Sequence, residues 1–119
     1  MTSNLKEWLA LNGYSQDNLN SVGKYGNSAI MKASREANLS IVDELISLNV
    51  DLNVKNIDGN SALWNACFGD SYACFEALVS AGINIDSQNV NNVTSLMYCA
   101  SAGKDIFVVL LIKHKANTE

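Results

Sequence analysis

A segment of this chain repeats at a fixed spacing of 33 residues. The sequence Gly-Asn-Ser-Ala-Ile at 26–30 returns as Gly-Asn-Ser-Ala-Leu at 59–63, and a looser copy, Asn-Val-Thr-Ser-Leu, occupies 92–96. Apolar residues further along each copy keep the same register, at Val42, Phe75 and Val108. A period of this length indicates that each copy folds as one small unit and that successive units stack, burying apolar faces against their neighbours.

The layout within each copy resembles the ankyrin repeat, which reads roughly G-x-T-P-L-H-x-A-A-x-x-G, then an apolar helix, then G-A-D-V-N. The first element stands here at 26–37, 59–70 and 92–103, and the last at 49–53 and 82–86. The resemblance covers residues 17–119. It implies an all-α fold, an ankyrin-repeat solenoid of stacked helix-turn-helix units joined by β-turn or hairpin loops.

The same register divides the chain into an N-terminal capping helix with a lead-in turn at 1–22 and three repeats in one continuous domain, at 23–55, 56–88 and 89–119. In each repeat we expect a first helix, at 29–36, 62–69 and 95–102, and a second helix, at 39–48, 72–81 and 105–114. The capping helix is expected to begin at the capping-box spacing of Asn4 and Glu7 and to end near Gly13.

Every T-P-L-H element is altered, and the chain contains no proline. The starts of the first helices therefore depend on Ser28, Ser61 and Thr94, whose hydroxyls can accept hydrogen bonds from free backbone N–H groups. Such a cap contributes about 1 kcal/mol, and proline at the first helical position would add a preset φ. We expect a correct but modestly stable fold.

The third unit departs from the others on its second helix. Polar residues stand at Asp43, Glu44 and Glu76, but Val109 and Leu110 occupy the equivalent positions in the last unit. A terminal repeat normally has a polar outer face, and leaving two such side chains in water forgoes about 3 to 6 kcal/mol of burial in total. Three explanations follow: the array continues into a further repeat, this face binds a second copy or another partner, or the helix turns inward and buries Val109.

Composition argues against several partner classes. The net charge is −4 without a cluster of lysine or arginine, so nucleic acid and anionic membranes are not expected partners. The longest apolar run, 106–112, is far short of a membrane span, and residues 1–7 lack the pattern of a signal peptide. The cysteines, Cys67, Cys74 and Cys99, fit reduced core positions. We therefore expect a cytoplasmic protein, with delivery into a host cell left open.

Residues for catalysis are sparse. His114 is the only histidine, no C-x-x-C motif occurs, and glycine clusters that cradle phosphate are absent. A position near the end of the last helix suggests that His114 is a solvated residue interacting with that helix end. We predict no catalytic residue, no cofactor, no bound metal and no enzymatic activity.

The resemblance implies where a partner binds, because ankyrin proteins usually contact other proteins through the hairpin tips and the outward side of the first helices. Carried over by register, the predicted partner-binding residues are Lys24, Tyr25, Asn27, Arg35, Glu36, Ile57, Asp58, Asn60, Phe68, Val90, Asn91 and Val93, with Val109 and Leu110 as a possible end-face contact.

Several of these predicted contacts are apolar for exposed positions. We expect Tyr25, Ile57, Phe68, Val90 and Val93 to form a contiguous stripe with charged flanks, the composition of an anchor patch with a polar rim. In this hypothesis the anchors are Tyr25, Ile57, Phe68 and Val90, and the rim charges that set orientation are Lys24, Arg35, Glu36 and Asp58. Trp64 and Met97 stand at the position of the family's histidine and are expected to be buried substitutes for it.

The predicted function is a protein-protein interaction module, a scaffold that binds a partner protein through its concave face and tips. One alternative is an assembly unit, or a fragment of a longer array, that uses the apolar last helix for homo-oligomerisation or further repeats. The other is a regulatory or inhibitory subunit of an enzyme. The identity of the partner does not follow from the fold, because function in such scaffolds resides in variable surface residues.

Overall fold

Residues 1–116 and Thr118 are described by the structure, a computed structural model. Over these residues the chain forms seven α-helices and one short 3-10 helix, in the order α1 (Ser3–Leu11), η1 (Lys24–Gly26), α2 (Ala29–Arg35), α3 (Leu39–Ser47), α4 (Ala62–Phe68), α5 (Tyr72–Ser80), α6 (Ser95–Ser101) and α7 (Asp105–Lys113). We call α2, α4 and α6 the first helices and α3, α5 and α7 the second helices.

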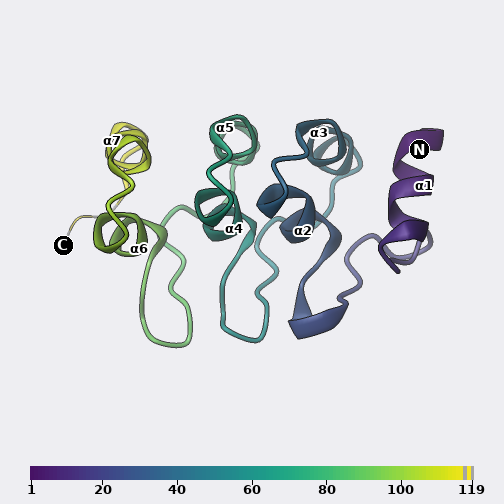
Figure 1. Ribbon diagram of the computed structural model, residues 1–119, viewed down its shortest axis with the longest axis horizontal. Helices are drawn as coiled ribbons and strands as arrows, with labels where there is room; N and C mark the ends of the chain where they lie inside the picture. Colours follow the sequence, from purple (N-terminus) through teal and green to yellow (C-terminus); the bar gives the residue numbers. More distant parts are fainter. Residues whose placement is uncertain (117, 119) are drawn as a thin grey trace.

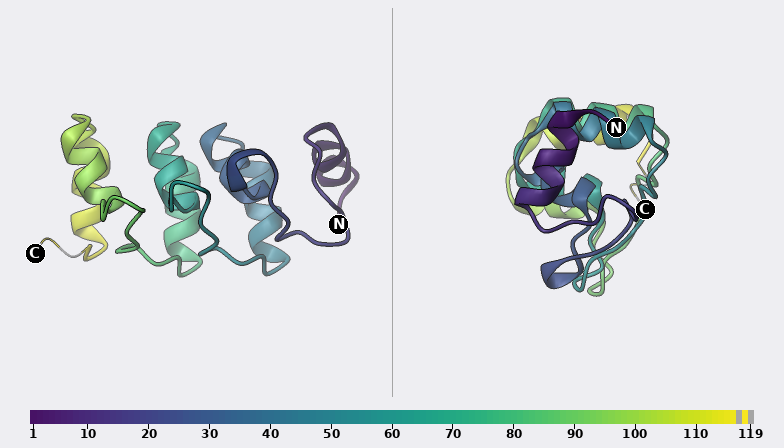
Figure 2. Two further views of the ribbon diagram at one scale, coloured as in Figure 1. Left: turned by 90° about the horizontal axis from the view of Figure 1, so that it is seen from below. Right: turned by 90° about the vertical axis from the view of Figure 1, so that its right-hand side faces the viewer.

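The helices stack in two layers (Figure 1). The first helices form one layer, the second helices form the other, and α1 stands at the end of the stack beside α2 and α3. The loops 23–27, 56–60 and 89–93, here called tips 1, 2 and 3, project away from the second helices to one side of the stack (Figure 2). The all-α stack of helix-turn-helix units predicted from the repeat is confirmed. Each first helix and each second helix begins at the expected residue and ends one residue earlier than expected.

The start of α1 differs from the prediction. Its N-cap is Thr2, not Asn4, and the Thr2 hydroxyl accepts a hydrogen bond of 3.2 Å from the backbone N–H of Leu5. The backbone N–H of Thr2 also donates to the carboxylate of Glu44 on α3, at 2.7 Å. One residue thus caps α1 and ties it to the first repeat, which explains why the N-cap lies two positions before the expected one.

The hydroxyl caps of the first helices form in only one of the three predicted places. Thr94 accepts from the N–H of Met97 at 3.2 Å, but Ser28 and Ser61 occupy N-cap positions without a side-chain cap bond. Threonine has a β-branched side chain with a restricted χ1, and serine lacks this constraint. The buried Ser28 hydroxyl has no hydrogen-bond partner within residues 1–116 and 118, so α2 begins without the predicted contribution.

Asparagine side chains join the tips to one another. The Oδ1 atom of Asn89 accepts from two backbone N–H groups of tip 3, at 2.9 and 3.0 Å, and its Nδ2 donates to Oδ1 of Asn60 at 3.1 Å. Asn56 makes the same bonds within tip 2 and donates to Oδ1 of Asn27 at 2.9 Å. Tips 2 and 3 are therefore each held in shape, and bonded to the preceding tip, by one side chain.

Backbone hydrogen bonds run along the same row of tips. The N–H of Ile57 donates to the carbonyl of Tyr25 at 2.9 Å, and the N–H of Val90 donates to the carbonyl of Asp58 at 3.0 Å. Gly59 has a φ of +77°, and a Cβ atom there would lie 2.7 Å from the backbone N of Val90. Glycine at this position allows the left-handed turn and the close approach of tips 2 and 3.

Aromatic packing joins the second and third repeats. The ring of Phe107 on α7 lies with its centroid 4.7 Å from that of Tyr72 and 5.5 Å from that of Phe75, both on α5. His114 is the C-cap of α7, at the helix end where it was expected, but it is not the solvated residue predicted. It is half-buried, and its Nε2 lies 3.3 Å from a carboxylate oxygen of Glu76. The last helix is thus fixed by an aromatic core and a polar contact at its end.

Cys67, Cys74 and Cys99 are buried and free, as predicted for core residues. A hydrogen bond with Cys99 and burial raise the pKa of the Cys67 thiol well above its usual range. The described part of the chain contains no helix long and apolar enough to cross a membrane.

The apolar face of α7 stays in water. Only Phe107 and Leu111 of this helix are buried, and Val109 is 65% exposed. The explanation in which α7 turns inward to bury Val109 is therefore wrong, because the buried positions lie one turn apart on the other side of the helix. Leu110 is half-buried.

Candidate functional site

The tips and the first helices meet at an angle and together form what we call the inner face. In the view down the stack, the tips project to one side below the helices (Figure 2). Two equivalent positions on the first helices carry different residues from repeat to repeat. The first repeat presents Lys32 and Arg35, and the equivalent residues of the second are Asn65 and Phe68.

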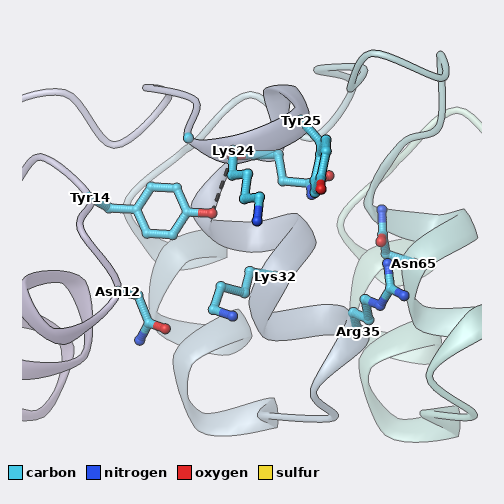
Figure 3. A pocket seen from close by; sticks show the side chains of 9 residues that line it. Asn12, Tyr14, Lys24, Tyr25, Lys32, Arg35 and Asn65 are labelled. Carbon is cyan, nitrogen blue, oxygen red and sulfur yellow. Dashed lines mark hydrogen bonds between the residues drawn. The ribbon is translucent and has the colours of Figure 1, made fainter.

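A pocket of about 400 Å³ lies on the inner face where tip 1, α2 and the end of α1 meet. Figure 3 shows its labelled side chains. Its lining consists of Asn12, Tyr14, Gly23, Lys24, Tyr25, Asn27, Lys32, Arg35 and Asn65. The volume falls within the range of about 300 to 1,000 Å³ that is usual for ligand sites.

Three cations enter this pocket. Lys24 comes from the tip, Lys32 from the middle of α2, and Arg35 from its last turn (Figure 3). Lys32 forms an ion pair with Glu36 at 3.0 Å, and no acidic residue is among the described residues that line the pocket. Tyr25, next to Lys24, has a φ of +60°, which is unusual for a bulky residue and is often found at binding sites.

Tyr14 forms a wall of the pocket and supports tip 1. Its hydroxyl donates to the carbonyl of Asn27 at 3.1 Å, and its ring stacks on Trp8 with centroids 5.9 Å apart. Burial, with a smaller effect of the Glu36 carboxylate, raises the pKa of Tyr14. The phenol is therefore a fixed neutral donor. Tip 1 has Gly23 at the position of the asparagines that brace tips 2 and 3, and Tyr14 supports tip 1 in place of such an asparagine.

An aromatic row continues from the pocket along the first helices. The guanidinium carbon of Arg35 lies 4.1 Å from the ring centroid of Phe68. Phe68 stacks on Trp64 at 5.4 Å, and Trp64 contacts Tyr98 of the next repeat at 4.7 Å. We call Trp64, Phe68 and Tyr98 the aromatic row. Phe68 remains exposed, and the other two rings are half-buried.

Most of the predicted contact residues reach the surface. The exposed ones are Lys24, Tyr25, Arg35, Glu36, Ile57, Asp58, Phe68, Val90, Asn91 and Val109, and the half-buried ones are Asn27, Val93 and Leu110. Asn60 is the exception, because it is 6% exposed and its side chain accepts from Asn89. The Oδ1 atoms of Asn27 and Asn60 accept the hydrogen bonds that join successive tips, so these oxygens are already used inside the fold.

The apolar stripe expected on this face is divided in two. Tyr25, Ile57 and Val90 lie along the hydrogen-bonded tips. Phe68 ends α4, about 10 Å along the helix axis from its N-cap Ser61 at 1.5 Å per residue, and belongs to the aromatic row. Val93 is half-buried, and its backbone N–H donates to Asn89 within tip 3.

The residues at the position of the family's histidine are less buried than expected. Met97 is 48% exposed, so its prediction as a buried substitute is wrong. Trp64 is half-buried; its ring stacks on Phe68 and makes a tilted contact with Tyr98. On α6 it is therefore Tyr98 that packs against Trp64, and the neighbouring Met97 side chain is left at the surface.

Several residues of this face were not among the predicted contacts, namely Asn12, Tyr14, Lys32, Asn65 and Tyr98, together with Trp64, which was predicted to be buried. The exposure of Lys32 on this face could have been predicted from the sequence. It stands one turn before Arg35, and a charged residue among small apolar ones indicates a side chain that points outward. Asn12 and Tyr14 precede the first repeat, where the period assigns no register. The described residues contain no group of three or more His, Cys, Asp or Glu side chains that could hold a metal ion.

Comparison with known proteins agrees with this architecture. A family model described as ankyrin repeats matches the chain in three copies, over residues 2–89 and 30–119. No curated protein matches the chain significantly.

Proposed function

This chain belongs to the ankyrin-repeat family, and we propose that it is a scaffold whose inner face binds a segment of a partner protein. Ankyrin repeats are generally protein-protein interaction modules. The observation that carries the proposal is the set of large apolar side chains that the inner face leaves in water. Exposed apolar groups gathered on one face of a small protein are typical of an interaction surface.

Two groups of anchors support this function. Tyr25, Ile57 and Val90 are exposed along the tips, whose backbone is fixed by the hydrogen bonds between successive turns. Phe68 is exposed at the end of α4 and is held between Trp64 and Arg35. Anchors with a fixed geometry bind with a smaller loss of conformational entropy, which favours affinity.

Charged side chains surround these anchors. Glu36 and Asp58 are exposed beside the basic pocket and on tip 2, respectively. Rim charges of this kind affect orientation and association rate more than affinity. We therefore assign the contact energy to the apolar anchors and the choice of orientation to the rim.

The first test removes one anchor from each group. The double variant Ile57→Ser, Phe68→Ser is expected to bind an identified partner at least about 100-fold more weakly than the wild type, since two anchors of about 2 kcal/mol each are lost. Binding is measured by calorimetry with a partner found by crosslinking and purification. Unchanged affinity would contradict the proposed site.

A matched control separates contact from solubility and folding. Leu39 and Leu48, at the two ends of α3, are also exposed apolar residues, but α3 is a second helix, on the far side of the stack from the tips. The double variant Leu39→Ser, Leu48→Ser is expected to keep the wild-type affinity within about twofold, and equal losses in both double variants would indicate a general effect.

A second candidate function is self-assembly through the end of the stack. Ile106, Val109 and Ile112 of α7 are exposed. Ile106 and Val109, with Asp105 and Leu110, line a shallow depression of about 230 Å³. We take the occupant to be the same face of a second copy, because the earlier second helices carry Asp43 and Glu76 where α7 carries Val109, and an apolar face is self-complementary.

Light scattering at several concentrations tests this second function. The wild type is expected to dimerise as concentration rises, and Val109→Glu is expected to stay monomeric, because the dimer would bury a carboxylate without a partner. Val90→Glu is the control, since Val90 has nearly the same exposure, 66%, on a tip instead of the end face. A wild type that is monomeric at all concentrations would refute self-assembly.

The three buried, free thiols suit a reducing compartment, and we propose a cytoplasmic location on that basis.

A further inference from the structure

We propose that the pocket between tip 1 and α2 binds an oxyanion, a carboxylate or a phosphate, on a side chain of the partner segment. The proposal rests on the proposed function of the inner face and adds the chemistry of the partner. The segment is an acidic or phosphorylated peptide whose anionic group enters the pocket while an apolar side chain lies on the aromatic row.

Charge is the first argument. The pocket gathers three of the eight basic residues of the chain, Lys24, Lys32 and Arg35. Five basic and twelve acidic residues remain elsewhere, so the rest of the chain carries a net charge of −7. A local positive site on an otherwise acidic protein attracts an anion to this place and repels it from the rest of the surface.

The second argument is that Arg35 has unused donors. Its side chain makes no ion pair with any described residue of the chain, and it stacks on Phe68 at 4.1 Å. Stacking uses the flat face of the guanidinium and leaves its N–H edge open. That edge matches two oxygens of a carboxylate or phosphate, and Phe68 restrains the group, so little entropy is lost on binding.

The two lysines complete the site from opposite sides. The Nζ atom of Lys24 lies 5.1 Å from the ring centroid of Tyr25 and has no ion-pair partner in the parts of the chain that are described. Lys32 has one ion-pair partner, Glu36, and this carboxylate does not line the pocket. Three cations and this single carboxylate leave a local charge of +2. A bound anion would relieve the repulsion between the cations, which lie in a partly enclosed space.

The position of the pocket connects it with a peptide. Arg35 lines the pocket and stacks on Phe68 of the aromatic row, so the two sites are neighbours on α2 and α4. Axes of packed helices are about 8 to 10 Å apart, and an extended peptide rises about 3.3 Å per residue. The anionic residue and the apolar residue of the partner segment are therefore expected about three positions apart.

Titration of the ¹⁵N-labelled protein, followed by its backbone amide signals, tests this inference. The probe is a heptapeptide, acetylated Ser-Gly-Glu-Gly-Gly-Leu-Ser amide, in which the acid and the leucine are three positions apart. Three variants of it carry glutamine or phosphoserine in place of glutamate, or alanine in place of leucine. Inorganic phosphate is titrated separately to distinguish a free anion from a side chain.

Saturable shifts centred on tip 1 and the last turn of α2 are expected with the glutamate or the phosphoserine peptide. The glutamine peptide is expected to bind at least about tenfold more weakly, because a charge-assisted hydrogen bond is worth about 1.5 to 3 kcal/mol. The better of the two anionic peptides identifies the oxyanion, and weaker binding of the alanine peptide supports contact with the aromatic row.

Protein variants locate the site. Lys24→Gln with Arg35→Gln is expected to weaken the anionic peptide at least about tenfold. Lys6→Gln with Lys113→Gln changes the net charge equally at exposed positions outside the pocket and is expected to have less than a twofold effect. If the first double variant does not fold, the single variant Lys24→Gln takes its place, with an expected loss of about threefold.

Four results would overturn the inference: no saturable shifts, equal binding of the glutamine peptide, equal loss in the control variant, or inorganic phosphate binding as tightly as the phosphopeptide. These are distinct from failure of the proposed function. A partner that still depends on Ile57 and Phe68 would show that the inner face binds protein and that the basic pocket takes no part.

Discussion

The Gly69→Ala variant is expected to lose about 3 kcal/mol of unfolding free energy, the upper end of the usual effect of overpacking. Gly69 is the C-cap of α4 and has a φ of −82°, a backbone conformation open to any residue. A Cβ atom there would lie 2.1 Å from the carbonyl oxygen of Arg35, 2.8 Å from its carbonyl carbon and 3.0 Å from its Cα.

All three of these atoms belong to the backbone of α2, so no rotation of a side chain relieves the clash. The first helices of repeats 1 and 2 would have to move apart, and the buried contacts between α2 and α4 would loosen. Because Arg35 lines the basic pocket, the same movement would also alter the pocket.

Urea denaturation, followed by circular dichroism, measures the loss of stability. Ala102→Gly is the control, because Ala102 occupies the equivalent C-cap of α6 and already carries a Cβ atom. That variant is expected to change stability by less than about 1 kcal/mol. A Gly69→Ala protein as stable as the wild type would mean that α2 and α4 are farther apart than described here.

Gly69 also marks the limit of what the repeat could predict. The glycine of the repeat pattern falls at Ala37, Asp70 and Gly103, and these residues have φ values of +59°, +56° and +72°. The left-handed backbone conformation is thus kept even where another residue replaces glycine, although it costs about 1 to 2 kcal/mol of conformational energy for each non-glycine residue. Gly69 precedes it, has an ordinary φ and is required only by packing, which a local pattern does not reveal.

The helices of the three repeats, α2 to α7, were predictable to within one residue because each position appears three times in the sequence. The same averaging hid the differences between repeats. Asn27 and Asn60 were predicted as contacts from their place on the tips, but Asn56 and Asn89 donate to them across successive tips. The repeat register shows that a residue lies on a tip. Whether its side chain is free depends on the first residue of the next tip, which is Asn56 for Asn27 and Asn89 for Asn60.

The candidate site was predictable in outline for the same reason. The tips and the last turns of the first helices follow from register, so Lys24 and Arg35 were expected on one face. The pocket itself was not predicted, since Tyr14 comes from the segment before the repeats and Lys32 lies one turn deeper on α2. The repeat register does not relate the segment before the repeats to tip 1 and α2, so only the three-dimensional fold shows that they meet at this pocket.

Phe75→Ala is expected to lose about 4 kcal/mol of unfolding free energy, a large part of the 5 to 15 kcal/mol typical of whole domains. The Phe75 side chain is fully buried, and its ring contacts Phe107 edge to face at a centroid distance of 5.5 Å. The equivalent residue of the first repeat is the smaller Val42. Alanine at 75 would therefore open a cavity at the junction between α5 and α7.

The consequence extends beyond the local cavity because repeats are stabilised mainly by their neighbours. Loss of the Phe75 ring leaves α7 attached through Tyr72 and through the contact of His114 with Glu76. We expect α6 and α7 to unfold before the rest of the chain in this variant. Amide hydrogen exchange should then show faster exchange in 95–113 than in 29–80.

Phe75→Leu separates the two contributions to this effect. Leucine fills most of the volume and removes the aromatic contact, so its expected loss is about 1 kcal/mol, the value of an aromatic pair beyond its buried area. A loss in Phe75→Ala no larger than in Phe75→Leu would mean that the cavity is refilled by movement of α7. In that case the buried side chains of α7 do not hold the helix rigidly, and its exposed apolar face would move as well. The Phe75→Ala protein should then show both weaker dimerisation and weaker protection of its amides from hydrogen exchange.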